Sequence, residues 1–269
     1  MKQKLTVLIP CRDERMNIRP CVEAARKVAD EVLVADSGSI DDTIDIVQSM
    51  GGCRLIEREW NGYAAFKNWA IPQAEHEWVL IIDADERVTD ELAAEINQLL
   101  EKPPEHIDGY WIKRRNFVMG HEVKRCGFNN DSVFRLIRRD KCRYNDRLVH
   151  EEIFVDPKRA GTLKHTFDHY TCWSYDQYLK KVDSYTKLGA QEKWRHGKKT
   201  TSMNLLIRPF FRFLQLYVLR GGFLDGRLGI QLCMIRAFGD CFLKQARLWE
   251  LECAKSQPDP EVDHVKRAA

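Results

Sequence analysis

The sequence contains no run of about 18 uninterrupted apolar residues, the length that a membrane-spanning helix requires. It has no C-x-x-C pair, and its nine cysteines are an odd number scattered along the chain. That usage fits neither a disulfide scaffold nor a zinc ribbon. The 43 basic and 40 acidic side chains nearly cancel, so the net charge of +3 demands neither nucleic acid nor a membrane as partner. These absences favour a protein of the reducing cytoplasm without a spanning helix.

Two kinds of pattern alternate early in the chain: short apolar runs, typical of buried strands, and segments with apolar residues at helical spacing. The runs lie at residues 5–9, 31–35 and 78–82, and the helical patterns at residues 17–29, 43–50 and 89–100. Shorter strand-like pieces, rich in aromatics and arginine, follow the third helical pattern. The 269 residues, 44% of them apolar, therefore predict an α/β fold with a mixed sheet flanked by helices.

The most informative motif is Asp83-Ala84-Asp85, at the end of the third apolar run. Ligands of open α/β sheets bind beyond the carboxyl ends of the strands. Two carboxylates at that position can hold a hard divalent cation against a diphosphate, so we favour Asp83 and Asp85 as metal ligands. The alternative is that Asp85 caps the next helix.

Polar segments also follow the first two runs, at residues 10–14 and 36–43. We expect these segments to lie at the same edge of the sheet, where carboxylates could accept hydrogen bonds from ribose hydroxyls and base N–H groups. Each could instead be an ordinary turn or helix cap, and Asp42 and Thr43 are good cap candidates.

In these segments the chain resembles the family 2 glycosyltransferases of GT-A fold, and most closely the branch that glucosylates lipopolysaccharide core heptose. The resemblance covers residues 5 to about 190 and rests on several motifs in the family's order. They are Ile9-Pro10-Cys11-Arg12-Asp13-Glu14, residues 34–43, Phe66-Lys67-Asn68, Asp83-Ala84-Asp85-Glu86-Arg87, residues 131–138 and Val149-His150-Glu151.

The resemblance implies transfer of a sugar, with inversion, from a nucleotide-diphosphate donor to an acceptor hydroxyl. It favours UDP-glucose as the donor and Mg²⁺ or Mn²⁺ as the cofactor. The donor-binding residues that we expect are Pro10, Arg12, Glu14, Asp36, Ser37, Lys67, Asp83, Asp85 and Arg87. Of these, Pro10, Glu14 and Asp36 would line the base and ribose pocket, and Lys67 would supply a cation.

The chain departs from the family pattern at two positions. Asp13 stands where an Asn is usual, and Arg87 stands where some relatives have a further metal ligand. Arg87 cannot bind a cation but could bind phosphate. The third metal ligand is therefore unassigned, and His150, His165 and His169 are candidates that could equally be structural.

An inverting transfer needs a carboxylate that takes the proton from the acceptor hydroxyl. Asp131 and Glu151 are the two candidates, with Asp131 slightly preferred for its place in the family pattern. The alternative for Asp131 is a structural ion pair with Arg135 or Arg138. We expect Arg135 and His150 on the acceptor side.

The charge balance changes in the last third of the chain. Between residues 193 and 247 lie eleven basic residues and two acidic ones, interleaved with aromatics as in Arg208-Pro209-Phe210-Phe211-Arg212. This pattern is typical of helices in an anionic membrane interface, although packing against the catalytic domain would also explain it. No nucleic-acid motif is present, so we expect no nucleic-acid partner.

The sequence therefore predicts a glycosyltransferase domain at residues 1–200 and a helical extension at residues 201–269. The resemblance implies a lipid-linked or lipopolysaccharide-core glycan as acceptor. It also implies a peripheral location at the cytoplasmic face of the inner membrane. Two alternatives remain open at this point: a metal-dependent nucleotidyltransferase, and a non-catalytic protein that binds a sugar nucleotide at a membrane.

Overall fold

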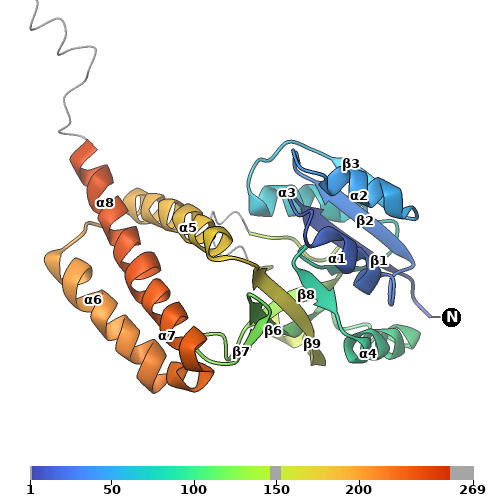
Figure 1. Ribbon diagram of the computed structural model, residues 1–269. Helices are drawn as coiled ribbons and strands as arrows, with labels where there is room; N and C mark the ends of the chain where they lie inside the picture. The colour runs from blue at the N-terminus through green and yellow to red at the C-terminus, as the bar shows by residue number, and fades with distance from the viewer. Residues whose placement is uncertain (1, 146–152, 255–269) are drawn as a thin grey trace, which may run out of the picture. The chain divides into compact units, whose positions relative to one another are not determined.

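The computed structural model describes residues 2–145 and 153–254 (Figure 1). Its contacts divide the chain into two compact units. The sheet unit consists of Met1–Lys124 and Phe128–Ser174, and the helical unit of Arg125–Gly127 and Tyr175–Ala269. The division after Ser174 falls before the predicted boundary at residue 200, so α5 (Tyr175–Arg195) lies in the helical unit.

The first half of the sheet unit is parallel, as the apolar runs predicted. Strands β1 (Leu5–Cys11), β2 (Glu31–Asp36), β3 (Arg54–Glu57) and β4 (Trp78–Ile81) pair in the order β3-β2-β1-β4. β2 and β4 therefore flank β1, and the three carboxyl ends lie at one edge. This topology brings together the polar segments that the sequence predicted to converge.

The second half of the sheet is mixed. After β4 the order continues β8-β6-β9-β5, formed by β8 (Ser132–Arg138), β6 (Gly109–Val118), β9 (Ala160–Cys172) and β5 (Glu86–Val88). β8 is antiparallel to β4 and β6, whereas β6 and β9 are parallel. The short β7 (His121–Val123) pairs with β6. The expected mixed sheet is thus confirmed.

Helices cover both faces of the sheet. Side chains alternate across β1, so Leu5, Val7 and Ile9 join a core with α1 (Ile18–Ala25), α2 (Thr43–Met50) and α4 (Asp90–Glu101). Leu8 joins a second core with α3 (Tyr63–Ala70). Single 3₁₀ turns occur at Ile71–Gln73 and Pro157–Arg159. Burial on both faces explains why the strands read as continuous apolar runs.

The helix that follows Asp85 is capped by a different residue. Strand β5 comes first, and the side chain of Thr89 accepts a hydrogen bond of 3.2 Å from the Leu92 N–H at the start of α4. The alternative that Asp85 caps this helix is therefore wrong.

The helical unit contains α5, α6 (Ser202–Leu214), α7 (Gly226–Met234) and α8 (Leu243–Cys253). Two π-helical segments, η3 (Gln215–Leu219) and η5 (Ile235–Phe242), and a 3₁₀ turn, η4 (Gly222–Asp225), lie between them. The predicted C-terminal helices are thus present. Across residues 2–145 and 153–254, no helix is both long and apolar enough to span a bilayer.

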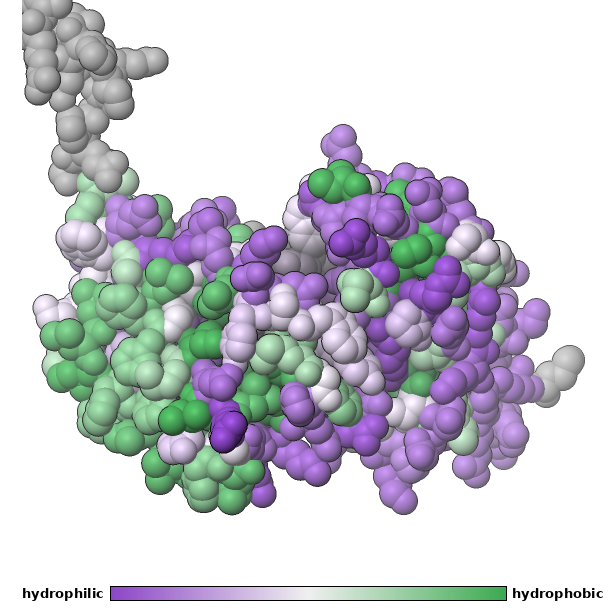
Figure 2. Space-filling view, in the orientation of Figure 1, coloured by the Kyte–Doolittle hydropathy of each residue, from purple (hydrophilic) through white to green (hydrophobic). Residues whose placement is uncertain are grey.

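The helical unit exposes many large apolar side chains, and Figure 2 shows hydrophobic residues gathered over it. Examples from α6 and η3 are Met203, Leu206, Phe210, Phe211 and Leu219. A soluble monomer rarely exposes a contiguous apolar area of this kind.

Candidate functional site

The loops after β1 and β2 are joined by hydrogen bonds. The Ile40 N–H donates to Oδ1 of Asp13 at 2.8 Å, and the Asp13 N–H donates to Oγ of Ser39 at 2.9 Å. Asp13 has a φ of 54°, a left-handed conformation that Asp tolerates better than most residues. Its side chain therefore stabilises the loop. This role is consistent with the departure from the family pattern at this position, where an Asn is usual.

Two of the residues expected to bind the sugar donor, Asp36 and Ser37, have buried side chains. Asp36 is 1% exposed and accepts hydrogen bonds from the N–H groups of Gly38 at 2.8 Å and Ser39 at 2.7 Å. The hydroxyl of Ser37 donates to the Cys11 carbonyl at 3.1 Å. Both residues therefore fix the loop after β2.

The other two residues of the first motif, Pro10 and Arg12, are more accessible. Pro10 is half-buried at the end of β1, and Arg12 is exposed. Nε of Arg12 lies 3.9 Å from the Asp13 carboxylate, a surface pair that contributes little to stability.

Glu14 connects the first loop with the turn that contains Asp83 and Asp85. Nδ2 of Asn17 donates to Oε2 of Glu14 at 2.8 Å. Oδ1 of Asn17 in turn accepts from Arg87 Nη2 at 3.2 Å and from Trp173 Nε1 at 2.9 Å. A half-buried carboxylate, a buried amide and a buried guanidinium thus hold the first loop against the turn.

Arg87 stabilises this turn through hydrogen bonds to its backbone. Its Nη1 donates to the carbonyls of Ala84 and Glu86, each at 2.8 Å, and its guanidinium lies 5.4 Å from the centroid of the Tyr170 ring. The residue is 9% exposed. These contacts favour a role in holding the turn over the phosphate contact that the sequence suggested.

Asp83 lies between two cations. Oδ1 is 3.2 Å from Nζ of Lys67, and Oδ2 accepts a hydrogen bond from Nη2 of Arg135. Burial alone would raise the pKa of Asp83, but Arg135 and Lys67 outweigh that effect and lower the pKa well below its usual value. Asp83 is therefore ionised at neutral pH, and both of its oxygens already have cationic partners.

Asp85 has a different partner. Its Oδ2 lies 3.5 Å from Nε2 of His169, and Nδ1 of His169 lies 2.7 Å from Oδ1 of Asn116. Nδ2 of Asn116 donates to Oδ2 of Asp131 at 2.9 Å, which fixes the amide so that its oxygen faces the imidazole. The proton of a neutral His169 is then on Nδ1, and the lone pair on Nε2 faces the Asp85 side.

A carboxylate and an imidazole lone pair side by side can both coordinate a divalent cation. Asn116 would orient the imidazole, as the hydrogen-bond partners of metal-ligating histidines do. Within the described residues, no group of three or more His, Cys, Asp or Glu side chains could hold a metal. A metal at Asp85 and His169 would therefore need further oxygens from a bound substrate.

The structure gives Asp131 a partner that the sequence did not predict. Nη2 of Arg114 donates to its Oδ1 at 2.6 Å, whereas Arg135 contacts Asp83 and Arg138 pairs with Glu77. The alternative that Asp131 pairs with Arg135 or Arg138 is therefore wrong. Burial would raise the pKa of Asp131, but Arg114 and Asn116 lower it below the usual value, so the carboxylate is ionised.

Asp83, Asp85 and Asp131 belong to one chain of polar contacts. From Asp83 it passes through Arg135 to Glu86 at 3.8 Å, through Arg114 at 3.2 Å, and on to Asp131. From Asp131 it continues through Asn116 and His169 to Asp85. The two ends of this series of contacts, Asp83 and Asp85, lie in the same short turn.

Three residues that take part in these polar contacts were not predicted from the sequence: Arg114, Asn116 and Glu86. Arg114 and Asn116 alternate along β6, so their side chains share one face of the strand. Polar residues at every second position of a buried strand could have indicated that these side chains belong to the site. The other two candidates on the acceptor side, His150 and Glu151, lie outside the described residues.

Comparison with known proteins gives consistent matches. A family model described as glycosyl transferase family 2 matches residues 6–179. The chain is 30% identical over 263 residues to the lipopolysaccharide core biosynthesis glycosyltransferase LpsC of Rhizobium meliloti, with 96% of each chain covered. It is 26% identical over 258 residues to an uncharacterized glycosyltransferase of Rickettsia typhi, with 93% of this chain and 88% of that relative covered.

Among solved structures, S. aureus TarS 1–349 in complex with UDP aligns with a TM-score of 0.47 and 17% identity. The alignment covers 94% of this chain and 92% of that one.

Proposed function

Because the chain belongs to glycosyl transferase family 2, we propose that it moves glucose, with inversion, from UDP-glucose to a hydroxyl of a lipid-linked lipopolysaccharide-core glycan. The family resemblance supports the donor and the inversion. The name of the Rhizobium meliloti relative supports the class of acceptor.

The observation that carries the proposal is the chain of polar contacts that joins Asp83 and Asp85 to Asp131. A displacement at the anomeric carbon needs charge stabilisation at the leaving diphosphate and a base at the attacking hydroxyl. The chain links candidates for both tasks. Its cations also lower the pKa values of Asp83 and Asp131, so both carboxylates are ionised and oriented.

On the donor side, we assign the base and ribose pocket to Pro10, Glu14 and the loop that Asp36 and Ser37 hold. Arg12 is exposed beside this loop and could reach a phosphate. Lys67 and Arg135 bring positive charge to Asp83, where a diphosphate would otherwise meet a carboxylate alone. Fixed cations of this kind stabilise the negative charge that develops on a leaving group.

For a divalent cation, the residues fit best at Asp85 and His169. Asp83 is a weaker candidate ligand than the sequence suggested, because Lys67 and Arg135 already occupy both of its oxygens. When bound, Mg²⁺ or Mn²⁺ would neutralise the diphosphate as the glycosidic bond breaks. His169 is oriented for this task by Asn116.

For the base, we propose Asp131, with Glu151 as the rival. Asp131 is ionised, as a base must be, and its oxygens are aimed by Arg114 and Asn116. Each of these hydrogen bonds lowers its basicity, so Asp131 would act only when the acceptor hydroxyl is held at hydrogen-bond distance. His150 would bind the acceptor, whereas Arg135, buried beside Asp83, would serve the donor side in place of the acceptor side that the sequence suggested.

The acceptor would reach the enzyme at a membrane surface. The apolar side chains of α6 and η3 and the local excess of basic residues support peripheral binding to an anionic membrane. The family resemblance supports the cytoplasmic face of the inner membrane as its place.

The test compares four variants: Asp131→Asn, Glu151→Gln, Asp85→Asn and the control Asp168→Asn. Asp168 also pairs with an arginine of β6, with Oδ1 2.7 Å from Nε of Arg115, but it lies outside the chain of contacts. Transfer of labelled glucose to truncated lipopolysaccharide is measured together with the thermal shift that UDP and Mn²⁺ produce.

We expect Asp131→Asn to lower kcat by roughly 10²-fold to 10⁴-fold with the UDP shift intact. Asp85→Asn should lose the part of the thermal shift that depends on Mn²⁺. Asp168→Asn should change neither kcat nor the thermal shift. Full transfer by Asp131→Asn together with its loss in Glu151→Gln would move the base to Glu151. Release of pyrophosphate instead of UDP would indicate a nucleotidyltransferase, and binding without turnover of any acceptor would indicate a non-catalytic protein.

A further inference from the structure

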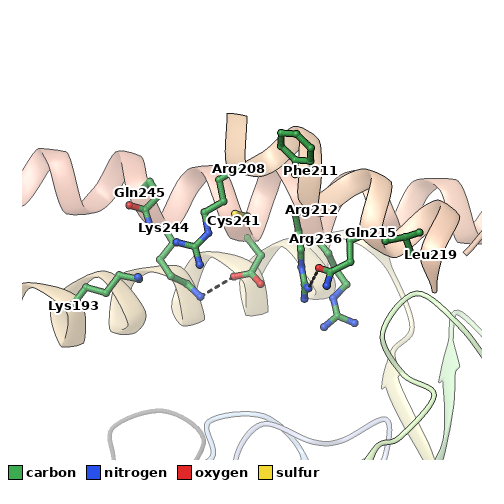
Figure 3. A pocket seen from close by; sticks show the side chains of 11 residues that line it. Lys193, Arg208, Phe211, Arg212, Gln215, Leu219, Arg236, Cys241, Lys244 and Gln245 are labelled. Carbon is green, nitrogen blue, oxygen red and sulfur yellow. Dashed lines mark hydrogen bonds and ion pairs between the residues drawn. The ribbon is translucent and has the colours of Figure 1, made fainter. Parts of the chain in front are cut away.

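The helical unit contains a basic cavity of about 660 Å³ that the transfer reaction does not use. Five of its lining side chains are cationic and one is acidic. The cations are Lys193 of α5, Arg208 and Arg212 of α6, Arg236 of η5 and Lys244 of α8. Figure 3 shows Lys193, Arg208 and Lys244 extending toward one another from three separate helices.

Most of this positive charge is not neutralised within the cavity. The one acidic residue, Asp240, pairs with Lys244 at 3.3 Å. Arg212 donates to Oε1 of Gln215 at 2.7 Å, a neutral partner. In the part of the chain that the structure describes, Lys193, Arg208 and Arg212 have no carboxylate within ion-pair distance.

The cations also destabilise one another in their charged forms. The pKa of Lys193 is lowered by burial first and then by Arg208 and Lys244. The pKa of Arg212 is lowered by burial and then by Arg236 and Arg220. A folded chain that gathers repelling charges around a cavity gains stability when an anion enters it.

The geometry suits a phosphate group. Arginine presents a planar fork of N–H donors that matches phosphate oxygens, and charge-assisted hydrogen bonds of this type are stronger than neutral ones. Lysines add point charge. Contributions from α5, α6, η5 and α8 let donors approach one anion from several directions.

The lining also includes apolar residues. Phe211 and Leu219 line the same cavity and are 63% and 81% exposed. Their neighbours on α6 and η3, Phe210 and Val218, are exposed as well. A ligand with a phosphate at one end and hydrocarbon at the other would satisfy both parts of this surface, whereas a free phosphate would satisfy only the cations.

We propose that this cavity binds the phosphate group of an anionic membrane lipid, with the acyl chains against the apolar side chains of α6 and η3. Binding of this kind adds a specific headgroup contact to the general attraction of basic helices for an anionic surface. The inference goes beyond the transfer reaction, because no residue of the donor or acceptor site takes part.

The test uses the full chain and a lipid that forms no membrane, so that surface charge cannot contribute. Calorimetry measures binding of dihexanoylphosphatidic acid below its micelle concentration, of inorganic phosphate and of dihexanoylphosphatidylcholine. The pocket variant is Lys193→Gln with Arg208→Gln. The matched control is Arg195→Gln with Lys199→Gln, which removes the same two kinds of charge from exposed positions outside the lining.

We expect the pocket variant to bind dihexanoylphosphatidic acid at least about tenfold more weakly than the control, because it loses charge-assisted hydrogen bonds. Inorganic phosphate should bind the native chain at least about tenfold more weakly, since a few methylenes against Phe211 and Leu219 account for that factor. The zwitterionic lipid should also bind more weakly than the acid.

Equal losses in the two variants would overturn the assignment to this cavity. Inorganic phosphate binding as tightly as the lipid would overturn the lipid part, and equal binding of the two lipids would overturn the role of the anion. Without ligand, the pocket variant should unfold at no lower temperature than the control, because it has lost two repelling cations. Both variants should keep the UDP-dependent shift, so the result does not depend on the donor site.

Discussion

Replacing Arg135 by methionine removes a guanidinium that is only 6% exposed and leaves two carboxylates with fewer partners. Asp83 would keep Lys67 at 3.2 Å, and the fully buried Glu86 would keep Arg114 at 3.2 Å. Methionine fills the space but supplies no charge. The variant therefore tests whether the polar contacts at the site act as a connected set.

The size of the effect follows from these contacts. Breaking a buried ion pair by removing one partner costs about 3–5 kcal/mol. Asp83 has a side chain that is 32% exposed and retains a second cation, so we expect about 3 kcal/mol, the lower end of that range. In an Asp83→Asn background, the same substitution should cost at least about 1 kcal/mol less, because one of the stranded charges is gone.

The cost should also depend on pH. The pKa of Asp83 is depressed in the folded protein, so its pairing contributes stability above the unfolded pKa of about 3.9. That contribution is lost as the pH falls through the folded value. In Arg135→Met the pKa of Asp83 rises, because one cation is missing. The difference from the native chain should therefore be greatest near about pH 7 and shrink below about pH 4.

Urea unfolding followed by tryptophan fluorescence measures this cost. Substituting phenylalanine for Trp194 and Trp249 leaves every remaining tryptophan in the sheet unit, so the signal reports on that unit alone. A cost of less than about 1 kcal/mol for Arg135→Met at neutral pH, or an equal cost in the Asp83→Asn background and the native one, would contradict a connected set of contacts.

Two further outcomes follow from packing and burial. A Cβ at Gly229 would lie 1.9 Å from the backbone oxygen of Gly222, so Gly229→Ala should destabilise the helical unit by about 2 kcal/mol. At Gly239 the nearest atom is 3.4 Å away, and alanine there should be neutral or stabilising by up to about 1 kcal/mol, as thermal unfolding would reveal. Burial raises the pKa of Cys142 to about 11, so a maleimide at mildly alkaline pH should label the half-buried Cys53 first, as mass spectrometry would map. Faster labelling of Cys142 would contradict its enclosure.

The position of the site could be predicted because it depends on local sequence. A buried parallel strand reads as a continuous apolar run, and the polar residue that follows marks its carboxyl end. Asp83 and Asp85 follow such a run, and residues 10–14 and 36–43 follow two others. Parallel pairing then brings these segments to one edge.

The partners at the site could not be predicted in the same way. The alternative role of Asp131 was a pair with Arg135 or Arg138, in the strand that directly follows it. The antiparallel register of β6 and β8 instead aligns Lys113 with Ser132, which sets Arg114 beside Asp131. A register is decided by packing across the sheet, and a list of charges along one strand carries no information about it.

His169 is a second example. Three histidines were candidates from the sequence, and none could be preferred. His169 reaches Asp85 because β9 pairs with β5 directly after the turn and with β6 on its other side, where Asn116 orients the ring. The alternative that Asp85 caps a helix failed for a related reason, since β5 intervenes and Thr89 is the cap.

By itself the sequence determined the α/β class, the positions of β1, β2 and β4 and of α1, α2 and α4, the family and the edge of the sheet where ligands would bind, whereas β3, α3 and β5 were not predicted. These follow from hydrophobic period and local motifs, which act over a few residues. Only the tertiary structure decided which charges neighbour one another, that Asp83 is enclosed by two cations, and that α5 joins the helical unit with its basic cavity. Such neighbours are distant in the chain, and their pairing depends on how whole elements pack.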